Sequence, residues 1–189
     1  EAERGPASLI PVVIGLDFGT FSTKVVARRR NERIAVVMQL DEACPGYPCF
    51  VIPSLIRLKD GQAFFGRCAA QVGGGQLFRS LKVSLLTGTA ERAGDNRRDG
   101  VSPDHLVAMY LAWVLGRVRQ WLDSEYGPDR TNVFVNAAAP MDHYETPELR
   151  ARYLRIVNCA WNAVWGPKPL RVEQGMSQAS IWQWVDDLL

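Results

Sequence analysis

Two short apolar runs rich in β-branched residues, at residues 12–16 and 25–27, lie near the start of the chain, and a compact polar turn separates them. This pattern predicts a strand, a turn and a second strand. A third β-rich run follows at residues 33–40, with Asn31 and Glu32 as the link to it. The first forty residues therefore predict three sequential antiparallel strands.

Prolines and glycines interrupt the pattern between residues 41 and 100, which predicts an excursion away from the sheet. Within it, residues 53–58 and 63–65 form a predicted hairpin, because Asp60-Gly61 between them is a strong turn signal. We expect residues 76–87 to form a helix or turn that carries Lys82. Residues 90–100 are charged and contain glycine, which predicts a surface loop.

Helical signals begin at residue 102. Ser102, Pro103 and Asp104 form a typical helix start, and Gly127-Pro128 predicts the end of that helix. A strand at 132–138 follows, and then a second helix runs from 146 to about 165. We expect the last strand at 170–173 and a final helix within 177–189.

This order of elements predicts an α/β fold with a five-stranded mixed sheet, three strands antiparallel and two parallel, and flanking helices. Residues 12–16 should lie in the interior of the sheet. The core comprises 9–40 and 101–189, and the excursion at about 41–100 forms an inserted small α+β subdomain. In such sheets, ligands bind at the carboxyl ends of the strands.

The turn after the first strand carries candidate chemistry at such an end. Gly19 permits a close approach of a phosphate to the backbone, and the hydroxyls of Thr20, Ser22 and Thr23 could donate to it. Asp17 could hold Mg²⁺ through water, because this ion keeps most of its waters and needs few protein oxygens. The turn is a candidate phosphate cradle. The alternative is an ordinary tight β-hairpin.

Composition narrows the classes of function. The 189 residues are 47% hydrophobic, enough for one domain or one large lobe with an ordinary core. The net charge of +2 requires neither a nucleic-acid partner nor a membrane surface. The four cysteines form no CxxC pair, and with only two histidines the chain offers no cysteine–histidine set of metal ligands. We expect reduced thiols, a cytoplasmic location and no membrane span.

The segment at residues 15–24 and later ones at 53–70, 132–140 and 171–185, together with Lys82, occur in an order that resembles the actin, sugar-kinase and heat-shock ATPase superfamily, and within it the DnaK-type heat-shock chaperones. The most specific is the first phosphate motif, GLDFGTFSTK at residues 15–24. Weaker similarities follow at PSLIRLKDGQAFFGRCAA (53–70), at Lys82, at NVFVNAAAP (132–140) and at RVEQGMSQASIWQWV (171–185). The resemblance implies a ribonuclease-H-like sheet and the first lobe of a two-lobed nucleotide-binding domain.

The resemblance also implies roles for individual residues. The backbone amides of Thr20, Phe21 and Ser22, beside Gly19, would bind the phosphates of ATP or ADP. Asp17 would hold Mg²⁺ through water, and Lys82 would reach the γ-phosphate or its attacking water. Gly175 stands where the family has an acid, with Glu173 two residues earlier.

The second phosphate motif and the adenosine motif of this superfamily are absent from the sequence. We therefore expect a fragment of a longer protein, whose partners would be its own second lobe and a client protein or co-chaperone. ATP hydrolysis would need that second lobe. The alternatives are a non-catalytic actin-like scaffold, which Gly175 favours, and a sugar or metabolite kinase lobe, which the chaperone-like segment at 53–70 disfavours.

Overall fold

A computed structural model describes residues 8–41, 48–88, 91–92, 101–138 and 146–188. The predicted loop at 90–100 lies outside these residues apart from 91–92, as do Cys44 and His143.

The main sheet is mixed and has five strands. They are β1 (Ile10–Phe18), β2 (Ser22–Arg29), β3 (Val36–Val37), β4 (Ile52–Pro53) and β9 (Thr131–Ala137). The order is β3-β2-β1-β9, and β4 pairs with β2 beside β3. β1 pairs antiparallel with β2 and parallel with β9. The predicted α/β class and the interior position of the first strand are therefore confirmed.

The alternation of buried and more exposed side chains along β1 explains its position in the interior of the sheet. Val12, Ile14, Leu16 and Phe18 are at most 2% exposed and face the helices. The intervening residues lie on the opposite face, which ends at the exposed Asp17. A strand with this period-two pattern has one face available for the core and one for solvent.

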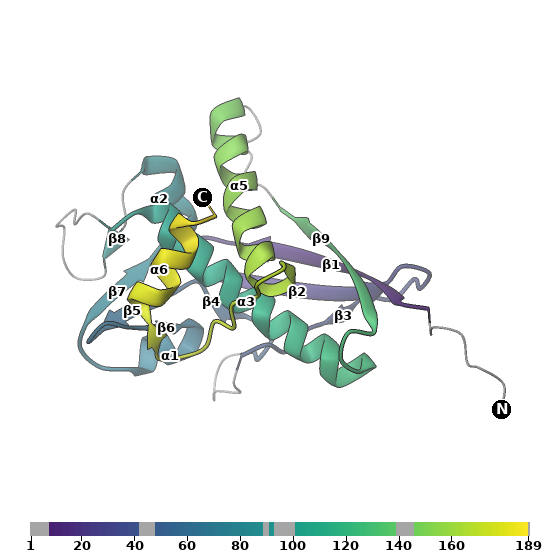
Figure 1. Cartoon of the computed structure of the whole chain (residues 1–189). Coiled ribbons are helices and arrows are strands. Elements are labelled where there is room, and N and C mark those ends of the chain that lie inside the picture. The colour runs from purple at the N-terminus through teal and green to yellow at the C-terminus, as the bar shows by residue number, and fades with distance from the viewer. Residues whose placement is uncertain (1–7, 42–47, 89–90, 93–100, 139–145, 189) are drawn as a thin grey trace.

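Helices cover the first of these faces. Figure 1 shows α3 (Pro103–Tyr126) and α5 (Pro147–Trp165) crossing in front of β1 and β2. Two shorter helices, α2 (Leu81–Thr87) and α6 (Gln178–Asp186), pack against α3. Residues 106–115 of α3 are buried all round because neighbours surround this stretch. The predicted starts at Pro103 and Pro147 are confirmed.

A second, smaller sheet has the order β10-β6-β5-β7-β8. Its strands are β5 (Ile56–Lys59), β6 (Gln62–Phe65), β7 (Gln76–Arg79), β8 (Glu91–Arg92) and β10 (Met176–Ser177), with α1 (Gly66–Gln71) after β6. Asp60 and Gly61 have φ values of 51° and 73°, which suit a tight hairpin turn, so the predicted hairpin is confirmed. The segment predicted as a helix or turn forms β7 and α2.

The strand predicted at 33–40 is much shorter than expected. Only Val36 and Val37 pair with β2. Beyond them, the N–H of Met38 donates to the carbonyl of Val25, and the side chains of Met38 and Leu40 are buried in the core. The chain turns inward here because these side chains enter the core, which ends the pairing.

The strand predicted at 170–173 is wrong. At one end, the N–H of Leu170 donates to the carbonyl of Ala163. At the other end, Gly175 and Gln178 donate to the carbonyls of Ala63 and Gly61, which draws the chain to β6. The segment therefore crosses to the smaller sheet, and β9 has no neighbour on its outer side among the described residues.

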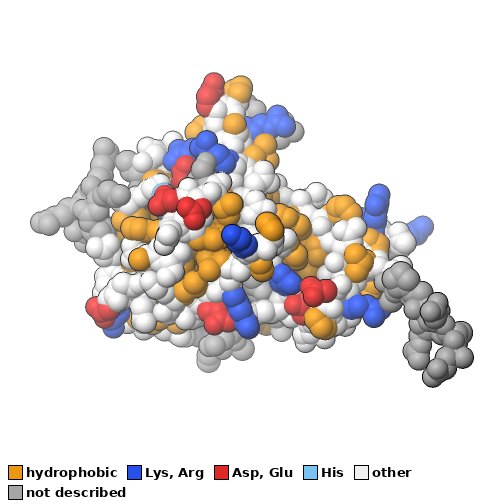
Figure 2. All heavy atoms as spheres, viewed as in Figure 1, with side chains coloured by type: hydrophobic (Ala, Val, Ile, Leu, Met, Phe, Trp, Pro, Cys, Tyr) orange, Lys and Arg blue, Asp and Glu red, His pale blue; other side chains and the backbone are white. Residues whose placement is uncertain are grey.

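The surface reflects this layering. On the face shown in Figure 2, hydrophobic side chains spread over the middle of the molecule and only a few charged side chains interrupt them. None of the helices in the described part has the length and apolar character needed to cross a bilayer.

Candidate functional site

The loop that joins β1 to β2 is a tight hairpin closed by Gly19 and Ser22. The N–H of Gly19 donates to the carbonyl of Ser22 over 3.0 Å, and Phe21 at the tip is 84% exposed. A Cβ added to Gly19 would lie 2.5 Å from that carbonyl oxygen. Glycine is therefore required at this position for the close approach of two backbone segments, and its φ lies outside the left-handed region.

The outer side of this loop carries hydrogen-bond donors that have no acceptor among the described residues. The N–H groups of Thr20 and Phe21 have no acceptor among the described residues. The hydroxyls of Thr20 and Ser22 also have no partner in this part of the chain, and both side chains are half-buried. Unused amides and hydroxyls gathered on one small loop are the donors that a phosphate group accepts.

A buried polar network holds the loop from below. The hydroxyl of Ser54 donates to the carbonyl of Gly19 over 3.0 Å, and the N–H of Ser54 donates to the carbonyl of Phe21 over 3.0 Å. Thr23 Oγ1 lies 3.1 Å from Ser54 Oγ, and the Tyr110 hydroxyl donates to Thr23 Oγ1 over 3.0 Å. Thr23 is completely buried, so it anchors the loop and does not offer its hydroxyl to a ligand.

Tyr110 connects this network to the core helix α3. Its hydroxyl also lies 3.2 Å from the carbonyl of Pro53, the residue before Ser54. Burial is the main cause that raises the pKa of Tyr110, so its hydroxyl stays protonated and remains a donor. The loop is thus fixed to α3 through two hydroxyl groups.

Asp17 lies at the open end of β1, exposed and opposite Lys24 on β2. Tyr153 of α5 marks the same end, since its hydroxyl donates to the carbonyl of Ala138, just beyond β9. Burial and then the charge of Asp17 raise the pKa of Tyr153 to about 12. The described residues contain no cluster of three His, Cys, Asp or Glu side chains. A hydrated Mg²⁺ needs only the one carboxylate, so Asp17 fits that ion.

Lys82 lies on α2, half-buried, and no contact joins it to Asp17 or to the loop in the described structure. Arg152 of α5 places α2 in the molecule, because it donates to the carbonyl of Leu85 over 2.9 Å and pairs with Asp104 at the start of α3. Its neighbour Tyr153 contacts the end of β9. Lys82 therefore belongs to the end of the molecule that holds Asp17, without reaching it.

Residues 171–185, which we call the connecting segment, lie apart from the loop at Gly19. Gly175 has φ of 73°, a conformation that side chains rarely adopt, so the fold itself selects glycine there. The amide of Gln174 binds both the N–H and the carbonyl of Phe65, at 2.8 and 3.0 Å. Glu173 forms an ion pair with Arg171 over 2.7 Å. None of the three contacts the loop at Gly19 in the described structure.

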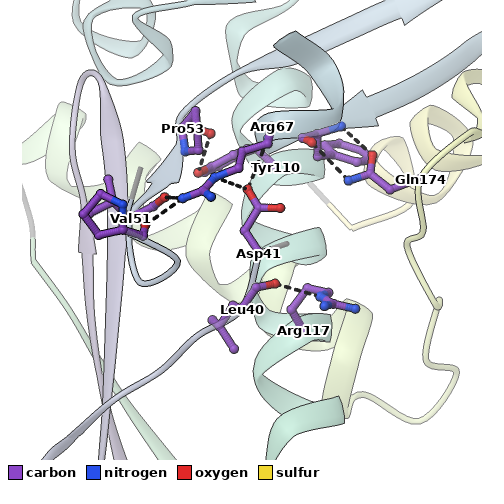
Figure 3. Close-up of polar contacts among 10 residues, drawn as sticks. Leu40, Asp41, Val51, Pro53, Arg67, Tyr110, Arg117 and Gln174 are labelled. Atoms are coloured by element: carbon purple, nitrogen blue, oxygen red, sulfur yellow. Dashed lines mark hydrogen bonds and ion pairs between the residues drawn. The ribbon is translucent and has the colours of Figure 1, made fainter. Parts of the chain in front are cut away.

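A cavity of about 390 Å³ is lined by residues of α1, of α3 and of this connecting segment. Figure 3 shows its polar framework: Arg67 donates to the carbonyl of Val51 and faces Asp41, while Arg117 donates to the carbonyl of Leu40. The cavity contains none of the residues of the loop. Its two arginines are engaged with the protein, and we do not place the phosphate site there.

The structure thus brings together Asp17, Gly19, Thr20, Phe21 and Ser22, and leaves Lys82 and Gly175 apart from them. Sequence reasoning missed the supports of this loop, which are Ser54 and Tyr110, and it missed Tyr153 at the end of β9. A signal for the first existed in the Pro-Ser pair at residues 53–54, which belongs to the chaperone-like segment. The aromatic residues gave none, because each occupies an ordinary core position of a helix.

Comparison with known proteins finds no matching family model and no matching curated protein. The resemblance to actin-like ATPases therefore rests on the sequence motifs alone.

Proposed function

We propose that this chain is the nucleotide-binding first lobe of a DnaK-type, actin-like ATPase, and that the loop after β1 binds the phosphates of ATP or ADP with Mg²⁺. The observation that carries the proposal is the loop at Gly19, which Ser54, Thr23 and Tyr110 hold in place and whose amides at Thr20 and Phe21 are unused. Protein phosphate sites use such clusters of backbone N–H groups.

The position of the loop supports the same proposal. It follows the central strand at its carboxyl end, where α/β sheets bind ligands. Its support by Ser54, Thr23 and Tyr110 keeps the backbone in place before a ligand arrives. Donors that are already oriented lose little conformational freedom on binding, which favours recognition of a charged group.

The chemistry of this lobe would consist of positioning and charge neutralisation. Bound Mg²⁺ would neutralise charge on the phosphates, and Asp17 would hold its water shell on one side. The loop amides would orient the phosphates. Lys82 would need to approach from α2, and a second lobe would supply the rest of the cleft.

Amide chemical shifts in a ¹⁵N-labelled sample of the 189-residue chain can test the proposal. Mg²⁺ with ATP, ADP or inorganic triphosphate should shift the resonances of Thr20, Phe21 and Ser22, because their N–H groups would meet phosphate oxygens. Adenosine alone should not. The turn at Asp60-Gly61 is the internal control, since it is also a tight hairpin turn of the same protein.

Gly19→Ala is the matched variant. Its Cβ would meet the carbonyl oxygen of Ser22, so the loop must open and the phosphate-dependent shifts should disappear while the rest of the spectrum is kept. Equal shifts at Asp60 and Thr20, or shifts that persist in Gly19→Ala, would contradict a phosphate site in this loop.

Hydrolysis is tested in a protein that also contains the second lobe. Asp17→Asn removes the charge that attracts the metal and keeps the shape of the loop. We expect single-turnover ATP hydrolysis to slow by about 10²-fold, or about 3 kcal/mol in activation free energy, with the fold intact. Lys82→Ala should have a similar effect only if closure brings α2 to the phosphates.

A non-catalytic actin-like scaffold is the second candidate. The observation that favours it is the connecting segment, where Gly175 replaces the family's acid and Glu173 pairs with Arg171 away from the loop. A two-lobed protein without turnover, whose ATP affinity Asp17→Asn leaves unchanged, would establish this alternative.

A further inference from the structure

β9 forms an open edge of the main sheet. Its inner side pairs with β1, and no described strand pairs with its outer side. The seven residues from Thr131 to Ala137 contain no proline and no charged residue. Natural sheets normally protect their edges with such residues, so an unprotected edge of this length is a site for pairing with another strand.

Pairing with β1 determines which backbone groups this edge presents. The N–H of Ile10 donates to the carbonyl of Arg130, and the N–H of Ala138 donates to the carbonyl of Leu16. In a parallel ladder this phase directs the even-numbered residues of β9 to β1. The N–H and C=O groups of Thr131, Val133, Val135 and Ala137 therefore point outward.

The sequence of this edge is nearly symmetric about Phe134. Residues 132–136 read Asn-Val-Phe-Val-Asn, the same in both directions. A two-fold axis at Phe134 would place Asn132 opposite Asn136 and Val133 opposite Val135. The valines carry the outward N–H and C=O groups, so this register forms antiparallel hydrogen-bonded pairs without any shift of phase.

Side chains agree with this register. Phe134 is 43% exposed on the face of the sheet away from the helices, and the guanidinium of Arg30 lies 5.9 Å from its ring centre. Arg30 follows β2, on the far side of β1, so it leaves the outer side of the ring open. Two phenylalanines opposite each other form a favourable cross-strand pair.

We propose that two copies of this chain pair through antiparallel β9 strands, centred on Phe134, and so join their main sheets into one. The inference rests on the free edge and its symmetric sequence, and it is independent of nucleotide binding. The segment 170–173 does not compete for this edge, because its hydrogen bonds at Leu170 and Gln174 hold it elsewhere.

A cysteine pair tests the register. In an antiparallel pair without hydrogen bonds, opposite Cα atoms are about 4.5 Å apart, which suits a disulfide. Phe134→Cys should therefore give a cross-linked dimer under mild oxidation, with the 134–134 link identified by peptide mass spectrometry. In Asn136→Cys the two cysteines would be about 13 Å apart, so that variant should stay uncross-linked at this site.

Sedimentation velocity over a range of concentrations tests the dimer itself. Phe134→Lys places like charges opposite each other and should weaken the dimer at least about tenfold. Leu154→Lys is the matched control, because Leu154 is 50% exposed on α5. Circular dichroism confirms that each variant is folded.

Three outcomes would overturn the proposal: an unmodified chain that stays monomeric at its highest soluble concentration, a dimer that Phe134→Lys leaves intact, or equal cross-linking at positions 134 and 136. The last would indicate a different register or a different kind of partner strand.

Discussion

Ser54 makes three of the hydrogen bonds that hold the loop of the candidate site. It joins the carbonyls of Gly19 and Phe21, and it also contacts Thr23. One short side chain and its own N–H thus fix both ends of the loop. The Pro-Ser pair in the sequence is best understood as a support for the loop that lies more than thirty residues before it.

Ser54→Ala should lower the free energy of unfolding by about 1–2 kcal/mol, because the carbonyl of Gly19 and the hydroxyl of Thr23 each lose a partner in a buried place. Urea unfolding measures this. Ser180→Ala is the control: Ser180 is exposed on α6, and its removal should change stability by less than about 0.5 kcal/mol. Equal effects of the two variants would show that the Ser54 contacts do not support the loop.

Tyr153 makes the free energy of unfolding depend on pH in the alkaline range. Burial raises its pKa to about 12, whereas an unfolded tyrosine titrates near 10. Between these values the unfolded chain has lost the proton and the folded protein keeps it, so stability should be complete below pH 10 and fall as the pH rises toward 12. Tyr153→Phe should make this fall shallower in urea unfolding.

Tyr126→Phe is the control for that measurement. Tyr126 is less buried, and its pKa is raised mainly by burial but to a smaller extent. An identical pH profile for the two variants would contradict the burial of Tyr153 against the end of β9.

At the scale of elements, residues 174–186 connect the smaller sheet to the helices. Gln174, Gly175 and Gln178 bind the backbone of β6, and the two residues of β10 complete the smaller sheet. α6 then packs on α3, where the ring of Trp182 lies 5.9 Å from His105. The segment thus ties the smaller sheet to the helical layer.

Gln174→Ala should release this segment. Losing both hydrogen bonds to Phe65 should raise the rate of amide exchange in residues 174–186 by about tenfold, with little change in β1 and β9. Exchange measured by mass spectrometry resolves these regions. Gln183→Ala, on the exposed side of α6, should leave the rates unchanged. Uniform changes over the whole chain would contradict a local role.

Much of this architecture follows from the sequence because the signals are local. The β1–β2 hairpin, the turn at Asp60-Gly61 and the starts of α3 and α5 are each encoded within a few residues, by β-branched runs, turn residues or proline. The loop at Gly19 belongs to the same group, since its residues are contiguous.

The parts that could not be predicted depend on distant partners. The β-rich run at 170–173 has a strand-like composition, but two prolines precede it and Gln174 binds Phe65 more than a hundred residues away. The two-residue strand β10 gives no periodic signal at all. Tyr110 and Tyr153 look like core residues from their spacing, and only the tertiary structure brings their hydroxyls to the loop and to β9.

At the scale of the whole molecule, the candidate site is open. Asp17 and the loop lie at one end of β1, and both Asp17 and Phe21 are exposed there. A ligand held from one side by a few amides and one hydrated metal loses much of its binding energy to solvent competition.

We therefore expect the 189-residue chain alone to bind ATP weakly and to hydrolyse it negligibly. Titration calorimetry and a phosphate-release assay measure the two properties. A dissociation constant below the micromolar range for the monomer would show that this chain already holds a complete site, and a cleft shared with a second lobe would then be unnecessary.

The long-range pairing of this fold also determines when it can form during synthesis. A ribosome releases β1 early, but the parallel neighbour of β1 is made only at residues 131–137 and the edge strand of the smaller sheet only at 176–177. Until then the nascent chain has β1 and β6 with exposed edges, a state open to mispairing on crowded polysomes. Both sheets can close only after residue 177 has left the exit tunnel, so β1 and β6 each wait for a partner strand made more than a hundred residues later.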